Sequence, residues 1–164
     1  VLKAGAVGLK TNAVWQGFPL SAEFLKPYAA LAEKYNAYFL LHVDQAFRHS
    51  TASAAHLYDL VKELPQAKII AAHMGGMLGS YQMFLPVAQH LKNLYFDTAV
   101  SETLQMINFY VQAGLEDKII FGSDFPFNHC HSQKIVVERI QELGLPENIV
   151  RKIFSENWKK LTGR

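Results

Sequence analysis

Four polar residues each stand where a short apolar run ends. His42 follows YFLL, His73 ends KIIAAH, Asp97 ends LYFD and Asp124 ends KIIFGSD. In a parallel α/β fold the carboxyl ends of the strands lie on one face, where active sites are built. Two imidazoles and a carboxylate gathered there form a nitrogen and oxygen ligand set that suits zinc, manganese or iron. We therefore predict a divalent-metal site built on His42, His73 and Asp124.

Each of these residues, taken alone, has a commoner structural explanation. A single histidine at a strand end usually belongs to a hydrogen-bonded scaffold, and a single aspartate usually caps a helix. Because these residues all stand at the ends of successive apolar runs, a ligand role is favoured over those explanations. Gly75 and Gly76, directly after His73, predict a tight backbone turn beside its ring.

The elements that must position these residues are short strands separated by helices. The predicted strands share β-branched and aromatic residues that are apolar at successive positions, which is typical of strands buried on both faces of a parallel sheet. They cover residues 6–10, 38–43, 68–73, 94–97 and 118–124. Their starts recur about every 30 residues, the length of one βα unit. Two architectures fit this spacing, an open doubly wound sheet and part of a (β/α)₈ barrel.

Helical periodicity fills the segments between the strands. Leu57, Leu60, Val61 and Leu64 follow the i, i+3, i+4, i+7 spacing of a helix that buries one face. Ser21 and Ser101 are predicted N-caps, while Pro65 and Gly114 mark helix ends. A last helical stretch is expected to open at Pro146.

Composition excludes several classes of protein. The chain has 164 residues, half of them apolar, and a formal net charge of +2, so we expect one globular domain over 1–164 and neither a nucleic-acid nor a membrane partner. The single cysteine, Cys130, cannot form an internal disulfide, which favours a cytoplasmic location. No apolar run is long enough to span a bilayer.

Four segments around the polar residues resemble the later strands of the amidohydrolase superfamily. They are HVD at 42–44, AHMGG at 72–76, NLYFDT at 93–98 and FGSDFPF at 121–127. The branch they resemble is amidohydrolase 2, metal-dependent hydrolases with a TIM-barrel fold. The resemblance extends over nearly the whole chain, and the order and separation of its segments match. It implies the C-terminal part of a (β/α)₈ barrel, covering strands four to eight.

The resemblance also implies roles for individual residues. His42 corresponds to the strand-five metal ligand, and Asp124 to the strand-eight residue that binds metal and shuttles a proton. His73 corresponds to the strand-six residue, a ligand in some branches and a group that polarises the substrate in others. Lys10 corresponds to the end of strand four, where we favour a substrate-facing role over a carboxylated lysine bridging two metals.

Further residues are candidates for contacts with a small-molecule substrate. Arg48 and His49 follow the strand that bears His42 and could bind a carboxylate. His129 lies in a loop beyond Asp124, where a substrate contact and an ordinary polar loop are equally plausible. Trp15, Phe125 and Phe127 could line an aromatic pocket, although packing explains them equally well.

One departure from the family pattern is clear. The family supplies two more ligands from a His-x-His pair on its first strand, and no such pair precedes His42. His129-Cys130-His131 follows the last strand and is not its equivalent. We therefore expect five of the eight barrel units here, as in a truncated chain, which the start at Val1 would fit. Open sheet edges then predict a homo-oligomer or a part of a longer polypeptide.

Three functions remain open at this point. The first is a metal-dependent hydrolase that cleaves a C–N or C–O bond, as in an amide or lactone, through metal-activated water, with zinc expected and manganese or iron as alternatives. The second is a metal-dependent decarboxylase of an aromatic or unsaturated carboxylate. The third is a non-catalytic barrel fragment. A nucleotide-binding sheet is disfavoured because GAVGLK lacks the G-x-G-x-x-G spacing.

Overall fold

Five parallel strands form one sheet in the computed structural model, which describes residues 1–43, 53–76, 84–86, 88–99, 104–127 and 132–163. The strands are β1 (Gly8–Thr11), β2 (Tyr38–Leu41), β3 (Lys68–Ala71), β4 (Leu94–Asp97) and β5 (Ile119–Ile120). All five predicted strands are confirmed. The strand β4 has the predicted bounds, β1, β2 and β3 are one or two residues shorter than their apolar runs, and β5 keeps only two residues of its run.

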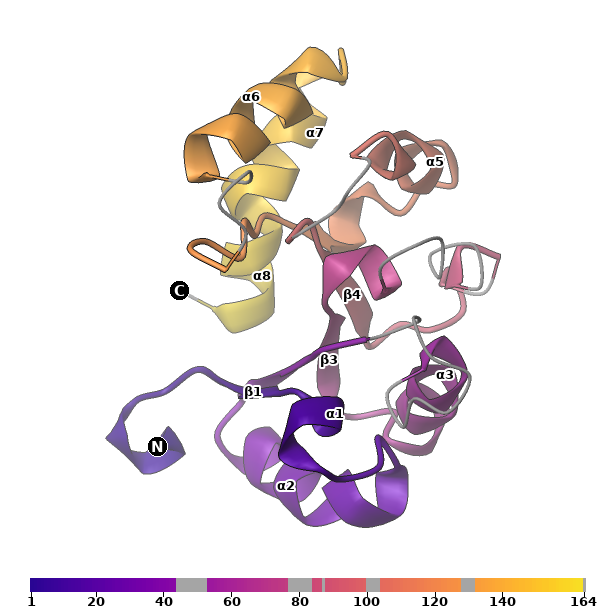
Figure 1. Cartoon of the computed structure of the whole chain (residues 1–164), viewed down its shortest axis with the longest axis vertical. Helices are drawn as coiled ribbons and strands as arrows, with labels where there is room; N and C mark the ends of the chain where they lie inside the picture. The colour runs from indigo at the N-terminus through magenta and orange to yellow at the C-terminus, as the bar shows by residue number, and fades with distance from the viewer. Residues whose placement is uncertain (44–52, 77–83, 87, 100–103, 128–131, 164) are drawn as a thin grey trace.

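The strand order decides between the two architectures. Neighbours in the sheet are consecutive in the chain, from β1 to β5, and every pair is parallel. A doubly wound sheet reverses its strand order at a switch point, whereas a barrel does not. The helices α2 (Ala22–Lys34), α3 (Ala54–Glu63) and α5 (Met106–Gln112) follow one another around the outside of the sheet (Figure 1). The arrangement is therefore that of a partial barrel.

Further helical segments lie along the rest of the described chain. They are η1 (Leu2–Ala4), α1 (Ala13–Gln16), η2 (His73–Gly75), η3 (Glu116–Lys118), α6 (Gln133–Glu142), α7 (Glu147–Arg151), the π-helical η4 (Lys152–Glu156) and α8 (Asn157–Thr162). Pro146 is the N-cap of α7, so the last helical stretch begins where the sequence predicted. Ser21 caps α2 by accepting a hydrogen bond from the Phe24 N–H, whereas Ser101 lies outside the described residues. Within the described part of the chain, no helix has the length and apolar character needed to cross a membrane.

The main core lies between the sheet and the helices. Phe39 and Leu41 of β2 are buried on this side against Leu57 and Leu60 of α3 and their neighbours. On the other face a small cluster joins buried residues of β3, β5 and α8 with half-buried aromatic and aliphatic side chains. Its members are Ile70, Ile120, Leu161, Tyr38, Leu40, Tyr95 and Trp158. Burial of both faces, predicted for all strands, is right for β3 but wrong for β2, whose inner face is only half covered.

The edge of the sheet at β5 is shorter than predicted. The strand has only two residues, and the N–H of the next residue, Phe121, donates to the carbonyl of Ile153 in η4 at 2.9 Å. The C-terminal helical segment therefore occupies hydrogen-bonding positions that a longer edge strand would leave open. The open edge expected at this end of the sheet is therefore short, and part of it is already paired.

Asn93, directly before β4, connects that strand to the end of α3. Its Nδ2 donates to the carbonyl oxygens of Val61, Leu64 and Ala67 at 3.2, 2.9 and 3.2 Å. The last carbonyls of a helix have no partner within the helix, so a side-chain amide placed there satisfies them. One residue thus fixes both the end of α3 and the approach to β4.

We predict that Asn93→Ala lowers the free energy of unfolding by about 1–3 kcal/mol, because buried carbonyls lose their donor. Equilibrium unfolding in urea, followed by circular dichroism, measures the difference. Asn148→Ala is the matched control, since Asn148 is exposed on α7 and its loss should change stability by less than about 0.5 kcal/mol. Equal stability of Asn93→Ala and the wild type would contradict a capping role.

Candidate functional site

His42 and His73 lie side by side at the carboxyl ends of β2 and β3. The Nδ1 of His42 and the Nε2 of His73 are 2.9 Å apart, within hydrogen-bonding distance, and the rings meet edge to face. His42 directly follows β2, and its N–H still pairs with the carbonyl of Thr11 at the end of β1. The predicted convergence of the two histidines is confirmed, although they are separated by 31 positions in the chain.

The backbone at His73 has an uncommon conformation. His73 and Met74 have φ values of 60° and 55°, in the left-handed region that L-residues avoid, and Gly75 follows at 91°. A Cβ on Gly75 would lie 2.7 Å from a ring carbon of Phe84, so the turn also requires a residue without a side chain. The turn predicted from the two glycines therefore exists, and it begins at the histidine itself.

The ring of His73 is held on its other side by a carbonyl. His73 is 4% exposed, and its Nδ1 lies 2.9 Å from the carbonyl oxygen of Ala99. A carbonyl only accepts hydrogen bonds, so Nδ1 must carry the hydrogen. In the neutral ring Nε2 then presents its lone pair to His42. Histidines that bind metal ions commonly donate their second ring N–H to a carbonyl or carboxylate in this way.

Asp97, the last residue of β4, lies beside His73 and is 7% exposed. Its Oδ1 accepts hydrogen bonds from the backbone N–H of His73 at 2.8 Å and of Ala99 at 3.1 Å. Burial raises the pKa of the Asp97 carboxyl above its ordinary value, while the charges and hydrogen bonds of its surroundings, those of His73 foremost, act in the opposite direction. The sequence indicates Asp97 at a strand end but gives no sign of its role, and Ala99 carries no sequence signal because it acts through its backbone alone.

Thr98 extends the pairing of β4 and β5 beyond both strands. Its Oγ1 donates to the carbonyl of Gly122 at 2.8 Å and accepts from the Gly122 N–H at 3.0 Å. This pair of bonds fixes the backbone two residues before Asp124. Asp124 itself is exposed, has a φ of 57°, and closes a turn in which its carbonyl accepts from the Phe127 N–H. Asp124 therefore lies on a turn past the end of β5 at Ile120, whereas the sequence predicted it as the last residue of that strand.

Lys10 is the substrate-binding candidate that the structure places near this group. It lies on β1 opposite Leu40 in the strand register, one residue before the strand ends, and it is exposed. Its positive charge acts on Asp97 and opposes part of the rise in the carboxyl pKa that burial causes. The other three candidates, Arg48, His49 and His129, lie outside the described residues.

Aromatic side chains from the two ends of the sheet meet. The rings of Trp15, on α1 after β1, and Phe127, after β5, are 5.5 Å apart, although these strands are the two outermost in the described sheet. Both are largely exposed, at 72% and 67%. The loops at the carboxyl ends of β1 and β5 therefore approach one another, as the curvature of a barrel requires.

The two histidines fit a metal ion, but the described residues do not complete its ligand set. His42 and His73 are the residues that would hold such an ion, and the Ala99 carbonyl already selects the tautomer of His73 that leaves its Nε2 lone pair available. Among the described residues, no three His, Cys, Asp or Glu side chains are grouped closely enough to hold a metal. Asp124 is among the described residues but is not grouped with the two histidines, so its role as the third ligand stays a prediction.

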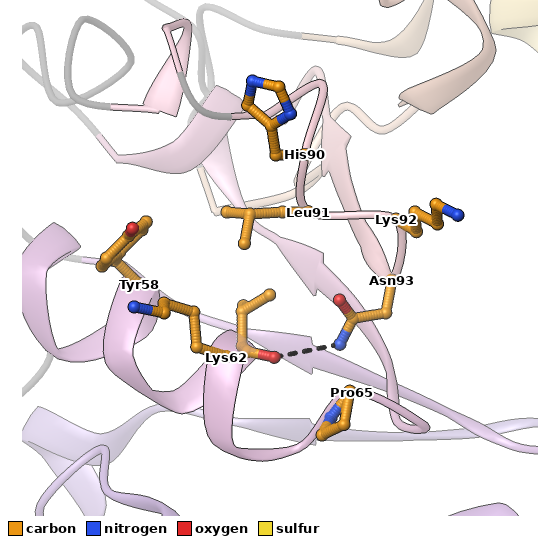
Figure 2. Close-up of a pocket in the computed structure, with 8 residues that line it drawn as sticks. Tyr58, Lys62, Pro65, His90, Leu91, Lys92 and Asn93 are labelled. Carbon is orange, nitrogen blue, oxygen red and sulfur yellow. Dashed lines mark hydrogen bonds between the residues drawn. The ribbon is translucent and has the colours of Figure 1, made fainter.

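A groove of about 460 Å³ lies at the opposite end of the strands. Figure 2 shows it between α3, which supplies Tyr58 and Lys62, and the segment His90–Asn93 that leads into β4. Pro65 and Asn93 lie shortly before β3 and β4 begin, whereas His42 and His73 follow the strands. The groove is therefore separate from the histidine pair and lies on the face that serves stability in barrels.

Comparison with known proteins agrees with the partial barrel. The chain is similar to an uncharacterised TIM-barrel protein from Bordetella bronchiseptica, with 18% identity and a TM-score of 0.80 over 99% of this chain and 60% of that one. A probable 2-pyrone-4,6-dicarboxylic acid hydrolase from Acinetobacter baumannii is 19% identical, with a TM-score of 0.72 over 99% and 66%. A 5-carboxyvanillate decarboxylase from Novosphingobium aromaticivorans, complexed with manganese, is 17% identical, with a TM-score of 0.74 over 98% and 57%.

These likenesses concern the fold, and this chain spans less than two thirds of each of the three structures. A search of curated proteins finds no match. The amidohydrolase family model, in contrast, matches residues 1–163 and so includes every candidate site residue. With the parallel partial barrel and the histidine pair at its strand ends, this match identifies the chain as a member of the amidohydrolase family.

Proposed function

We propose that this chain contributes to the metal site of an enzyme that hydrolyses a C–N or C–O bond, as in an amide or a lactone. The observation that carries the proposal is the contact between Nδ1 of His42 and Nε2 of His73, with the second nitrogen of His73 bound to the Ala99 carbonyl. Buried scaffold histidines can also share a hydrogen bond, but the family membership and the position at the strand ends favour a metal site.

The proposed roles follow from the chemistry of the side chains. His42 and His73 would hold the ion, with Asp124 as the third ligand. A divalent cation supplies Lewis acidity in such a site and lowers the pKa of water to about 7. Asp124 accepts the proton from the attacking water and delivers it to the nitrogen or oxygen that leaves. Water is thereby added across the bond, with Asp124 carrying the proton between its two ends.

The metal is proposed to be zinc, manganese or iron, since imidazole and carboxylate ligands suit all three. The manganese in the similar 5-carboxyvanillate decarboxylase supports including that ion. Lys10 is the proposed contact for an anionic group of the substrate, because its charge already acts on the inner side of the sheet at Asp97. Arg48, His49 and His129 stay predicted substrate contacts.

A second candidate is decarboxylation of an aromatic carboxylate. The similarity to a decarboxylase and the exposed aromatic pair of Trp15 and Phe127 favour it. In this reaction Asp124 would donate its proton to the carbon that loses carbon dioxide. The same residues serve both reactions, so product analysis separates them: carbon dioxide release indicates the second candidate, and a new carboxylic acid without it indicates the first.

We predict that the purified chain holds near-stoichiometric zinc, manganese or iron, measured by plasma mass spectrometry. Asp124→Ala and His42→Ala should each lose most of it, because each removes one proposed ligand. Metal should also be released on acidification, because protons compete with the metal for the imidazole ligands.

Matched controls come from elsewhere in the chain. His90→Ala and Asp59→Ala remove exposed residues of the same types, on the segment before β4 and on α3, and should keep the metal. Wild-type chain without metal would contradict the proposed site and would favour a non-catalytic barrel fragment.

We predict that Lys10→Met lowers kcat/KM for a carboxylate substrate about ten- to hundredfold, chiefly through KM, because one charge-assisted hydrogen bond is lost. Neutral lactones or amides should be turned over as by the wild type. Steady-state assays with paired charged and neutral substrates measure the difference, and Lys26→Met on the exposed side of α2 is the control. Equal losses for both substrates would rule out an anion-binding role for Lys10.

A further inference from the structure

The conformation of His73 requires support from outside its own segment. His73 and Met74 occupy the left-handed region in succession, which costs about 1–2 kcal/mol for each residue. Such a conformation persists only where the surrounding structure imposes it. Part of this support is local, because the N–H of Gly76 donates to the carbonyl of His73. The N–H of His73 itself points away from its own strand and needs an acceptor from another element.

That acceptor is one oxygen of Asp97 on the neighbouring strand. The Asp97 Oδ1 accepts from the N–H of His73 at 2.8 Å and, at the same time, from the N–H of Ala99 at 3.1 Å. All three groups are buried. A single oxygen atom therefore joins the turn after β3 to the segment after β4 and sets the distance between them.

The same segment also determines the ring of His73. The carbonyl of Ala99, the residue whose N–H binds Asp97, accepts the hydrogen on Nδ1 of His73 at 2.9 Å. Free neutral histidine prefers the opposite tautomer, with the hydrogen on Nε2. The segment around Ala99 thus holds the ring in its minor tautomer and turns the Nε2 lone pair toward His42.

We propose that Asp97 is a positioning residue for His73, which fixes both its left-handed backbone and, through Ala99, its ring tautomer. The position of the oxygen, rather than its charge, performs this role, since both contacts are made by Oδ1 with backbone N–H groups. The consequence for metal binding rests on the proposed function, whereas the consequence for the tautomer does not.

The test compares Asp97→Asn with Asp97→Ala in the metal-free chain. Asparagine keeps an oxygen acceptor at the same place, and alanine removes it. Nitrogen-15 spectra of the histidine rings report which ring nitrogen carries the hydrogen. We expect His73 to be protonated on Nδ1 in the wild type and in Asp97→Asn, and to shift toward the Nε2-protonated form in Asp97→Ala. Asp59→Asn, an exposed change on α3, should leave the spectrum unchanged.

Metal affinity supplies a second, separate measurement. Titration with manganese should show a loss of about ten- to hundredfold for Asp97→Ala and little change for Asp97→Asn. If no variant and no wild-type chain binds metal, the proposed function fails while the tautomer result still tests Asp97.

Three outcomes would overturn the proposal. The first is an Asp97→Ala chain that unfolds at lower temperature yet keeps the Nδ1-protonated ring, which would make Asp97 a stabiliser of the turn alone. The second is a folded Asp97→Asn chain that loses the tautomer, which would show that charge holds His73. The third is a wild-type ring protonated on Nε2. If Asp97→Ala does not fold, the second and third outcomes still decide the matter.

Discussion

The arrangement of the candidate site depends on the reversal of the chain at His73. The strand β3 ends at Ala71, and within two residues the backbone enters the left-handed region and stays at positive φ through Gly76. This reversal allows a side chain at the end of one strand to face a side chain at the end of the next. Because the conformation is unfavourable for histidine and methionine, groups on β4 must compensate for it. The turn and the neighbouring strand therefore form one unit, although they are separated in the sequence.

The segment from Asn93 to Thr98 supports both ends of the sheet. At its start, Asn93 satisfies two carbonyls at the end of α3 and the carbonyl of Ala67, directly before β3. At its end, Asp97 holds the turn of His73, and Thr98 holds the backbone of Gly122. The amino end of the strand thus contributes to stability and the carboxyl end to the geometry of the site, which is the division of roles found in barrels. The groove beside Asn93 belongs to the first of these ends (Figure 2).

Two imidazoles with a selected tautomer form part of the proposed metal site, and the partial barrel explains why further ligands are expected from other strands. A barrel gathers ligands from strands all around its axis, so an arc of five strands contributes only those on its own side. The chain covers 57–66% of the length of the three similar structures described above, which agrees with such an arc. The inner face of β1 and β2 is correspondingly less covered than the face toward the helices.

The sequence by itself determined the five strands, their parallel βα order and the pairing of His42 with His73. These features follow from local apolar runs, helical periodicity and motifs that each lie within a few residues, and the motifs also carried the resemblance to the amidohydrolase family. Only the tertiary structure decided between a doubly wound sheet and a barrel, since strand order depends on contacts between distant segments. It alone assigned a role to Asp97 and Ala99, because their contacts run between strands and involve backbone N–H and carbonyl groups that every residue possesses. The burial of each strand face was likewise a tertiary property, because it depends on whether another element, such as α8, lies against that face.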